Sequence, residues 1–420
     1  MLEFSDANYQ FFEPKPSKPI IALSRAVNRH FVLPGRNHLI KDIQLEGNTD
    51  RIRDLRKMGH RILFVMNHPS HSDPQIVTEL HRRMGITSSF MAAYDVFLRS
   101  KQAAWWMQRL GHFSIDREGN DRKAMGTAID ILKEGKVALG IFPEGNVYLT
   151  NDRVTPFLDG TAFIALKAQK SLEKKKVSVV PLSLKFTHLT TPRITLRTRM
   201  RQLGDDSGFT FDPDPDPIEA VLGLGTHLLA AHLRTHGYWN DISPTDRDVH
   251  QKLDRLAHTI MSDIEEELNL PPSVSDELIV RVRKARSTIH QLRINAECDS
   301  ESNTDLFRSK AQKTILALRI HGYLTPYLTA NPTIDRFDET VEKLSEDFYS
   351  KAMPRTGPRR LIAKVHPPLD VTQYLNAADG KLRDAVSSLT KDMEDRVQKG
   401  IDVINEKNGA PGATSLEEVS

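Results

Sequence analysis

The sequence contains very little cysteine and no long apolar segment. Cys298 is its only cysteine, so no disulfide can form within the sequence, and the polar run NAECDSES around it offers nothing that would activate the thiol. The longest nearly apolar run, 220–233, is interrupted by threonine and histidine and falls short of the roughly 20 residues that cross a bilayer. We therefore expect a reducing, cytoplasmic compartment and, at most, peripheral contact with a membrane.

Other familiar signals are also missing. Residues 1–19 carry acids and prolines where a signal peptide needs basic residues followed by an apolar core, so we expect no export signal. No zinc-finger spacing, RNA-binding aromatic signature or basic region linked to heptads is present, and we predict no nucleic-acid partner.

Negative charge is scarce in the first half of the chain. Residues 1–200 hold 31 Lys and Arg against 19 Asp and Glu, whereas 201–420 hold 27 against 36, although the net charge is only +3. The first half should attract anions. DNA, anionic lipid, a nucleotide cofactor and a phosphorylated metabolite all satisfy that sign, so charge alone selects none of them.

The length and patterning predict an α/β fold with a second, helical part. A chain of 420 residues exceeds the usual size of one core, and its 39% hydrophobic and 27% charged residues are typical of folded proteins. Strand-like runs alternate with amphipathic helices up to about residue 200, which indicates an α/β layer structure. A turn-rich acidic segment, 204–217, is followed by helical periodicity.

A strand-like segment returns at 360–371 and is followed by one more long helix. We therefore predict four parts. These are an N-terminal extension (1–37), an α/β domain made of two segments (38–203 and 356–405), a mostly helical insertion (204–355) and a disordered tail (406–420).

The stretch FVMNHPSHSDP, 64–74, places several polar side chains where a buried strand ends. His68 ends the strand, and Asp73 starts the next helix with Pro74 at its first position. On one helix, residues five apart lie roughly 140° apart and cannot meet, but the bend lets the Asp73 carboxylate fold back onto the His68 imidazole. A histidine held in this way keeps one tautomer and can accept a proton near neutral pH.

The same bend has other interpretations. Asp73 before Pro74 is a good helix N-cap and needs no further role. His68, His71 and Asp73 could ligate a metal, although H-x-x-H-x-D matches no common zinc spacing. His71 could also replace His68 as the base. The local sequence leaves these alternatives open.

Two later segments place polar groups at strand ends in the same manner. LGHFSIDRE ends a strand with Arg117, and LGIFPEGN ends another with Glu144 and Gly145. Three strands would thus bring polar groups to one edge of the sheet, where open α/β sheets bind ligands. Taken alone, Arg117 is equally suited to a surface ion pair with a neighbouring carboxylate, and Glu144 to a helix start.

Taken in order, the N-H-x4-D, G-x5-R and F-P-E-G runs resemble the blocks of the glycerol-phosphate and lysophospholipid acyltransferase family. FLDGTAFIAL, VVPLSL and KVHPPLDVTQY are similar to its later segments. The resemblance covers roughly 38–200 and 360–405 and leaves the helical insertion unmatched. It departs from the family pattern at Asn146, Val147 and Tyr148, where Thr-Arg-Ser is common, and at Leu158, where a lysine is often found. This leaves Arg122, Lys123 and Lys167 as substitute phosphate ligands.

The resemblance implies a three-layer α/β/α acyltransferase domain acting at a membrane surface. It implies transfer of a fatty acyl group from acyl-CoA or acyl carrier protein, as co-substrate and without a resident cofactor or metal, to a hydroxyl of a glycerol phosphate or lysophospholipid. His68 would be the general base and Asp73 would orient it. The acceptor would be held by Asn67, Arg117, Phe142, Pro143, Glu144 and Gly145. A catalytically inactive lipid-binding protein on the same fold is the alternative.

Two further segments can be interpreted either as structural elements or as lipid-binding ones. AAWWMQRLG, with Trp105 and Trp106, could meet a bilayer or line an acyl groove, but aromatics at helical spacing favour a core role. RVRKARSTIHQLR, in the insertion, could touch anionic lipid, but a solvated helix face is the simpler prediction.

Overall fold

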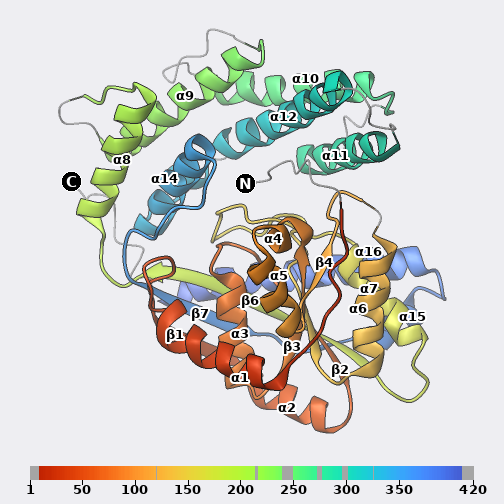
Figure 1. The fold of residues 1–420 in the computed structure, drawn as a ribbon. Coiled ribbons are helices and arrows are strands. Elements are labelled where there is room, and N and C mark those ends of the chain that lie inside the picture. Colours follow the sequence, from red (N-terminus) through yellow and green to blue (C-terminus); the bar gives the residue numbers. More distant parts are fainter. Residues whose placement is uncertain are drawn as a thin grey trace.

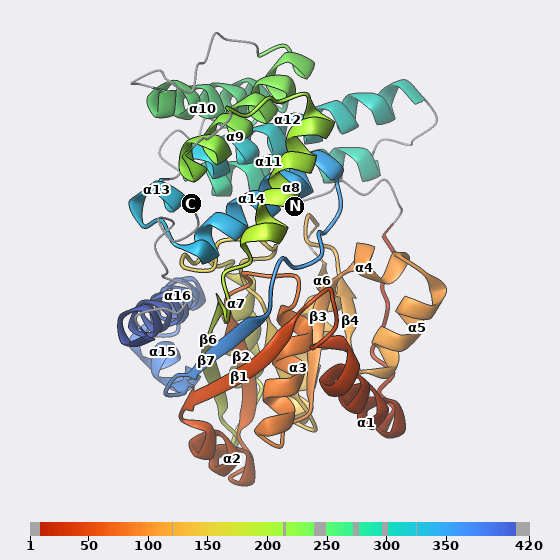
Figure 2. The ribbon, with the colours of Figure 1, turned by 90° about the vertical axis from the view of Figure 1, so that its left-hand side faces the viewer.

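The computed structural model describes residues 9–119, 121–212, 216–238, 249–271, 277–295, 301–324 and 326–408. Cys298 and most of the predicted tail lie outside these residues. Figure 1 shows a sheet domain beneath a layer of helices, and Figure 2 shows the same two parts from the side.

One mixed sheet organises the lower part. Its strand order is β1-β7-β6-β2-β5-β3-β4, with β8 paired to β6. The five strands from β2 to β6 run parallel, while β7 is antiparallel to β6 and parallel to β1. The carboxyl ends of β2, β3, β4 and β5 therefore meet at one edge. The strands are β1 (Ile40–Gly47), β2 (Arg61–Met66), β3 (Ser88–Ala93), β4 (Phe113–Ile115), β5 (Ala138–Ile141), β6 (Val177–His188), β7 (Arg359–Val365) and β8 (Leu369–Asp370).

Helices cover both faces of this sheet. α6, α7, α15 and α16 pack on one face, and α2 and α3 pack on the other, each with its own apolar cluster. A central strand such as β2, RILFVM, is apolar throughout because both of its faces are covered. The predicted three-layer α/β/α class is confirmed. The helices of this part are α2 (Thr49–Lys57), α3 (Asp73–Arg83), α4 (Tyr94–Leu98), α5 (Lys101–Arg109), α6 (Arg122–Glu134), α7 (Gly160–Lys170), α15 (Val371–Ala377) and α16 (Leu382–Asn408).

The upper layer has two apolar clusters of its own. Its first helix begins at Arg193, before the predicted boundary at 204, because Leu196 and Met200 pack against helices of this layer and not against the sheet. The first residues of the acidic segment 204–217 belong to this helix, α8, and residues 213–215 lie outside the described part of the chain. The helices are α8 (Arg193–Ser207), α9 (Pro217–Thr235), α10 (Val249–Glu267), α11 (Leu278–Asn295), α12 (Glu301–Leu324), α13 (Tyr327–Ala330) and α14 (Ile334–Tyr349).

The segment before β1 is packed against the sheet domain. It contains helix α1 (Lys18–Val27) and a π-helical continuation, η1 (Asn28–Val32). Arg25 donates to the carbonyl oxygen of Ile86 over 2.7 Å, and Asn28 donates to that of Gln75 over 2.8 Å. Polar side chains therefore attach this segment to the domain.

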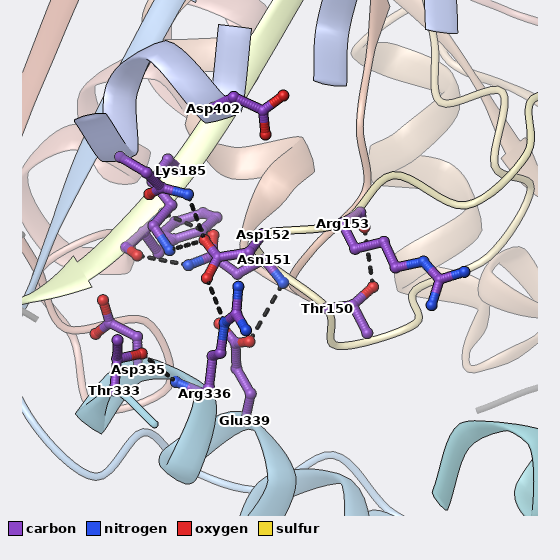
Figure 3. Close-up of polar contacts among 12 residues, drawn as sticks. Thr150, Asn151, Asp152, Arg153, Lys185, Thr333, Asp335, Arg336, Glu339 and Asp402 are labelled. Carbon is purple, nitrogen blue, oxygen red and sulfur yellow. Dashed lines mark hydrogen bonds and ion pairs between the residues drawn. The ribbon is translucent and has the colours of Figure 1, made fainter. Parts of the chain in front are cut away.

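A buried ionic network joins the helical layer to the sheet domain (Figure 3). Lys185 of β6 contacts Asp152, and Asp152 also accepts a bond from Arg336 of α14 over 2.7 Å. Nearby, Glu339 of α14 accepts bonds from the Tyr327 hydroxyl at 2.7 Å and from the Asn151 N–H at 3.2 Å. Because buried charges are tolerated only with such partners, the network sets how α14 sits on the end of β6.

A second buried contact between β6 and α14 predicts pH-dependent stability. His188 lies 2.7 Å from Asp335 and 3.2 Å from Asp338. Burial disfavours the charged imidazole, but the two carboxylates outweigh it and raise the pKa of His188 to about 9. A raised histidine pKa stabilises the fold fully below the unfolded value near 6.5, and this contribution is lost as the pH rises through about 9.

We therefore expect the free energy of unfolding to fall by about 3 kcal/mol between pH 6 and pH 10 because of His188 alone. Urea unfolding across this range measures the fall, and H188Q is the control that should lack this component. Glu339, whose pKa burial raises to about 8, adds a decline of the same sign in both proteins. Equal pH slopes for the two proteins would contradict the assignment.

Candidate active site

The bend after β2 brings His68 and Asp73 into contact. Nδ1 of His68 lies 2.7 Å from Oδ2 of Asp73, and the same oxygen accepts the Ser70 N–H over 2.9 Å. Ser72 occupies the N-cap position of α3, so Asp73 does not serve as its cap. The carboxylate is fully buried, which raises its pKa, and the bonds from His68 and Ser70 oppose that rise. The Nδ1 contact leaves Nε2 of His68 as the nitrogen that can accept a proton.

The loop after β5 supports His68 from the other side. The imidazole stacks on Phe142 with ring centroids 4.3 Å apart. The backbone N–H of His68 donates to Glu144 over 2.6 Å, and the second oxygen of Glu144 accepts the Thr155 N–H over 3.0 Å. Burial raises the pKa of Glu144 to about 7. Both carboxylate oxygens are thus used to hold loops together, which gives Glu144 a positioning contact and does not present it to an acceptor.

Asn67 has a similar structural use. Its side-chain amide donates to the carbonyl of Leu184 and accepts the N–H of the same residue, both over 2.8 Å. Asn151 repeats this two-bond pattern with Phe186 two residues further along β6. Each asparagine extends the hydrogen bonding of β6 beyond the point where its pairing with β2 ends, at Leu182. The motif residue Asn67 is thus buried and directed into the sheet.

Arg117 lies in the loop after β4. Its guanidinium donates to the carbonyl of Gly145 over 3.2 Å and to the side chain of Asn146 over 3.4 Å, and it lies 3.5 Å from Asp95. The adjacent carboxylates, Asp116 and Glu118, instead contact His290 and Arg286 of α11. These long bonds tie the loops after β4 and β5 together while the side chain stays 28% exposed.

A cavity of about 1350 Å³ separates this edge of the sheet from the helical layer. Five of the predicted site residues line it, namely His68, Arg117, Phe142, Pro143 and Gly145. Asn67, Asp73 and Glu144 do not line it and are buried beside these residues. Its lining combines apolar side chains with charged ones of both signs, so it offers contacts for hydrocarbon and for a polar head group. The apolar lining includes Phe90, Met91, Met107, Leu110, Ile115, Met125, Ile141 and Ile164.

Cations of the helical layer reach this cavity, whereas the substitute phosphate ligands suggested by the sequence do not line it. Arg122 and Lys123 lie on α6 and Lys167 lies on α7, and none of the three is among the lining residues. The lining cations from the helical layer are Arg308, Arg319 and Lys351. These residues lie in the part of the chain for which the sequence offered no role.

Side chains of helix α11 bind to the loops after β4 and β5, which carry the G-x5-R and F-P-E-G motifs. Arg286 donates to Glu118 over 2.7 Å, and His290 lies 2.5 Å from Asp116. Burial opposes ionisation of Asp116, but the contact with His290 holds its pKa below the usual value. One turn earlier, Arg283 donates to the backbone carbonyl of Glu144 over 2.8 Å. The basic run of the insertion is therefore not the solvated face predicted from its sequence.

The bend itself also contacts the helical layer. Nε2 of His71 lies 3.0 Å from Glu346 of α14, so His71 has a carboxylate partner of its own. Among the described residues, no cluster of three or more histidine, cysteine or acidic side chains has a geometry suited to a metal. The interpretation of His71 as an alternative base stays open, and substitution can test it.

The fold and the site together define an α/β acyltransferase domain, with a histidine–aspartate pair at the end of a central parallel strand. Residues 43–185, about a third of the chain, match the family model described as Acyltransferase. This match supports the glycerol-phosphate and lysophospholipid acyltransferase family for this domain. The resemblance drawn from the sequence motifs is thus confirmed.

A search of known proteins gives a distant relative. The chain is 28% identical over 148 residues, 34% of its length, to a glycerol-3-phosphate acyltransferase of Baumannia cicadellinicola subsp. Homalodisca coagulata. The match covers 18% of that relative, so the chain shares about a fifth of the relative's length with it. The family model ends at residue 185, before the first helix of the helical layer, α8.

Proposed function

We propose that the protein transfers a fatty acyl group from a thioester, acyl-CoA or acyl carrier protein, to a hydroxyl of a glycerol phosphate or lysophospholipid. The observation that carries this proposal is the 2.7 Å contact between His68 and the buried Asp73 at the floor of a large cavity. The site of action would be the cytoplasmic face of a membrane, where lysophospholipid acceptors reside.

The proposed step needs one proton acceptor and no enzyme nucleophile. Nε2 of His68 takes the proton as the acceptor hydroxyl oxygen attacks the thioester carbon. The new C–O bond forms, the C–S bond breaks, and the proton passes to the departing thiolate, giving an ester and a free thiol. Asp73 keeps Nδ1 protonated and stabilises the imidazolium formed on the way.

Arg117 is proposed to bind the phosphate of the acceptor. It lines the same cavity as His68, and a phosphate can replace its long bonds to Gly145 and Asn146 and compete with Asp95, which lies 3.5 Å away. A charge-assisted bond of this kind contributes about 1.5–3 kcal/mol. Arg319 of the helical layer lines the cavity as well and is proposed to add to its positive field.

The volume of the cavity suits a lipid. About 1350 Å³ exceeds the roughly 300–1,000 Å³ of most small-molecule pockets, and apolar side chains from β3, α5 and β5 line it. An acyl chain can occupy this apolar part while the reacting carbonyl lies near His68. This arrangement supports a lipid substrate over a small polar one.

The test is an acceptor screen with one radiolabelled acyl-CoA and one labelled acyl carrier protein. The panel contains glycerol 3-phosphate, lysophosphatidic acid and neutral lysolipids, and the product is separated by thin-layer chromatography. We expect ester formation that depends on the protein and favours a phosphorylated acceptor. Binding of lipid without turnover on the whole panel supports the inactive lipid-binding alternative.

A further inference from the structure

The polarity of α1 and η1 is the reverse of that of an ordinary surface helix. The face toward the protein carries Arg25 and Asn28, which bond to backbone carbonyls. An apolar row lies on its exposed side, with Leu23, Val27 and Phe31 exposed to 54%, 37% and 74% at spacings of four. An apolar stripe on the outside of a helix marks an interaction surface, since water does not stabilise it there.

Helices α4 and α5 extend this stripe. The chain just before α1 is bonded to the end of α5, because the N–H of Lys15 donates to Gln108 and that of Ser17 to Arg109, each over 2.9 Å. Both views place α1, α4 and α5 together on one side of the sheet domain (Figures 1 and 2). Leu98 and Trp105 are 38% and 47% exposed. Trp105 is therefore not the core residue that its sequence pattern favoured.

Negative charge is missing from both segments. Residues 18–32 and 96–109 each contain three Lys or Arg and no Asp or Glu. Lys18, Arg29, Arg99 and Lys101 are exposed, while Arg109 lies over the ring of Trp105 at 5.7 Å. Apolar and tryptophan side chains surrounded by cations are the composition that binds the interface of an anionic bilayer.

The active-site cavity reaches this same surface. Its lining includes Ile21 and Val27 from α1, together with Trp106 from α5 and Arg99. His68 lines the same cavity. A lipid could thus pass between a bilayer and the site without crossing water, which is the economical route for a substrate with an acyl chain.

We propose that residues 18–32 and 96–109, termed the α1/α5 surface, dock on an anionic lipid bilayer and open the cavity toward it. Among the described residues no helix is long and apolar enough to cross a membrane, so the association is interfacial. The proposed docking is argued from the composition of the α1/α5 surface alone. The delivery of substrate along the cavity, in contrast, rests on the proposed acyl transfer.

The test compares sedimentation of the full chain with vesicles of phosphatidylcholine alone and of phosphatidylcholine with 30% phosphatidylglycerol. We expect binding to the anionic vesicles that weakens as salt is raised. L23E/F31E should reduce the bound fraction at least tenfold. I194E and M58E are matched controls, because Ile194 of α8 and Met58 after α2 are 84% and 62% exposed on other elements, and they should bind as the unmodified protein does.

Several results would contradict the proposed docking on a bilayer. The proposal is overturned if the control variants lose as much vesicle binding as L23E/F31E does. It is also overturned if L23E/F31E binds vesicles normally at an unchanged melting temperature, or if the unmodified protein binds both vesicle types equally. A third contrary result would be that light scattering shows a dimer, that L23E/F31E dissociates it, and that neither protein binds vesicles. The α1/α5 surface would then bind a second copy of the chain. Transfer from a short-chain donor to dissolved glycerol 3-phosphate tests the proposed chemistry separately, and L23E/F31E should retain it.

Discussion

H68A is expected to lower the rate of acyl transfer by about 10²–10⁴ while the fold is retained. The loss corresponds to removal of a positioned general base, since the acceptor hydroxyl ionises too weakly at neutral pH to attack a thioester unaided. His68 is well placed for this role because Asp73 holds Nδ1 at 2.7 Å and Phe142 supports the ring. Initial rates with a labelled donor, together with circular dichroism, measure both parts of the expectation.

Three companion variants sharpen this experiment. H60A is the matched control, since His60 precedes the same strand at its opposite end and contacts Ser178 over 2.8 Å. It should keep the full rate. D73N should fall between H68A and the unmodified protein, because the amide retains an acceptor for Nδ1 but no charge to stabilise the imidazolium. If H71A loses its activity while H68A remains active, the base is His71 and not His68.

R286M is expected to raise the KM for a phosphorylated acceptor about tenfold, with a smaller change in kcat. Arg286 and His290 hold Glu118 and Asp116, the two neighbours of Arg117, so α11 orients the guanidinium without touching the substrate. A tenfold change corresponds to about 1.4 kcal/mol, less than one well-formed bond between phosphate and guanidinium. Steady-state kinetics with glycerol 3-phosphate and with a neutral acceptor measure the difference.

The same variant should lower the free energy of unfolding by about 1.5–3 kcal/mol, since a charged hydrogen bond is lost and Glu118 keeps its charge. The double variant E118Q/R286M should recover part of this stability but not the low KM. K284M is the control on the same helix, at an exposed position. An equal rise in KM for phosphorylated and neutral acceptors would show that α11 has a general structural role and does not position Arg117.

The motif residues divide in a way that their spacing could not indicate. His68 and Arg117 line the cavity as the sequence led us to expect, whereas Asn67 and Glu144 use their side chains to join strands and loops. A residue near a strand end can be directed into the cavity or into the sheet, and a shift of one position along the chain reverses its direction. Sequence order predicts the neighbourhood of such residues but not the direction of each side chain.

Local chemistry in the sequence by itself determined the α/β/α class, the strand that ends at Met66 and the bend that lets the imidazole and carboxylate meet. These features depend on hydrophobic periodicity and on contacts between residues a few positions apart. Only the tertiary structure decided that α11 supports the site loops and that α1 turns apolar side chains outward. The contacts between α11 and those loops join positions more than 120 residues apart. The helix period of α1 does not say which of its faces meets the protein, so both features depend on how the finished elements pack.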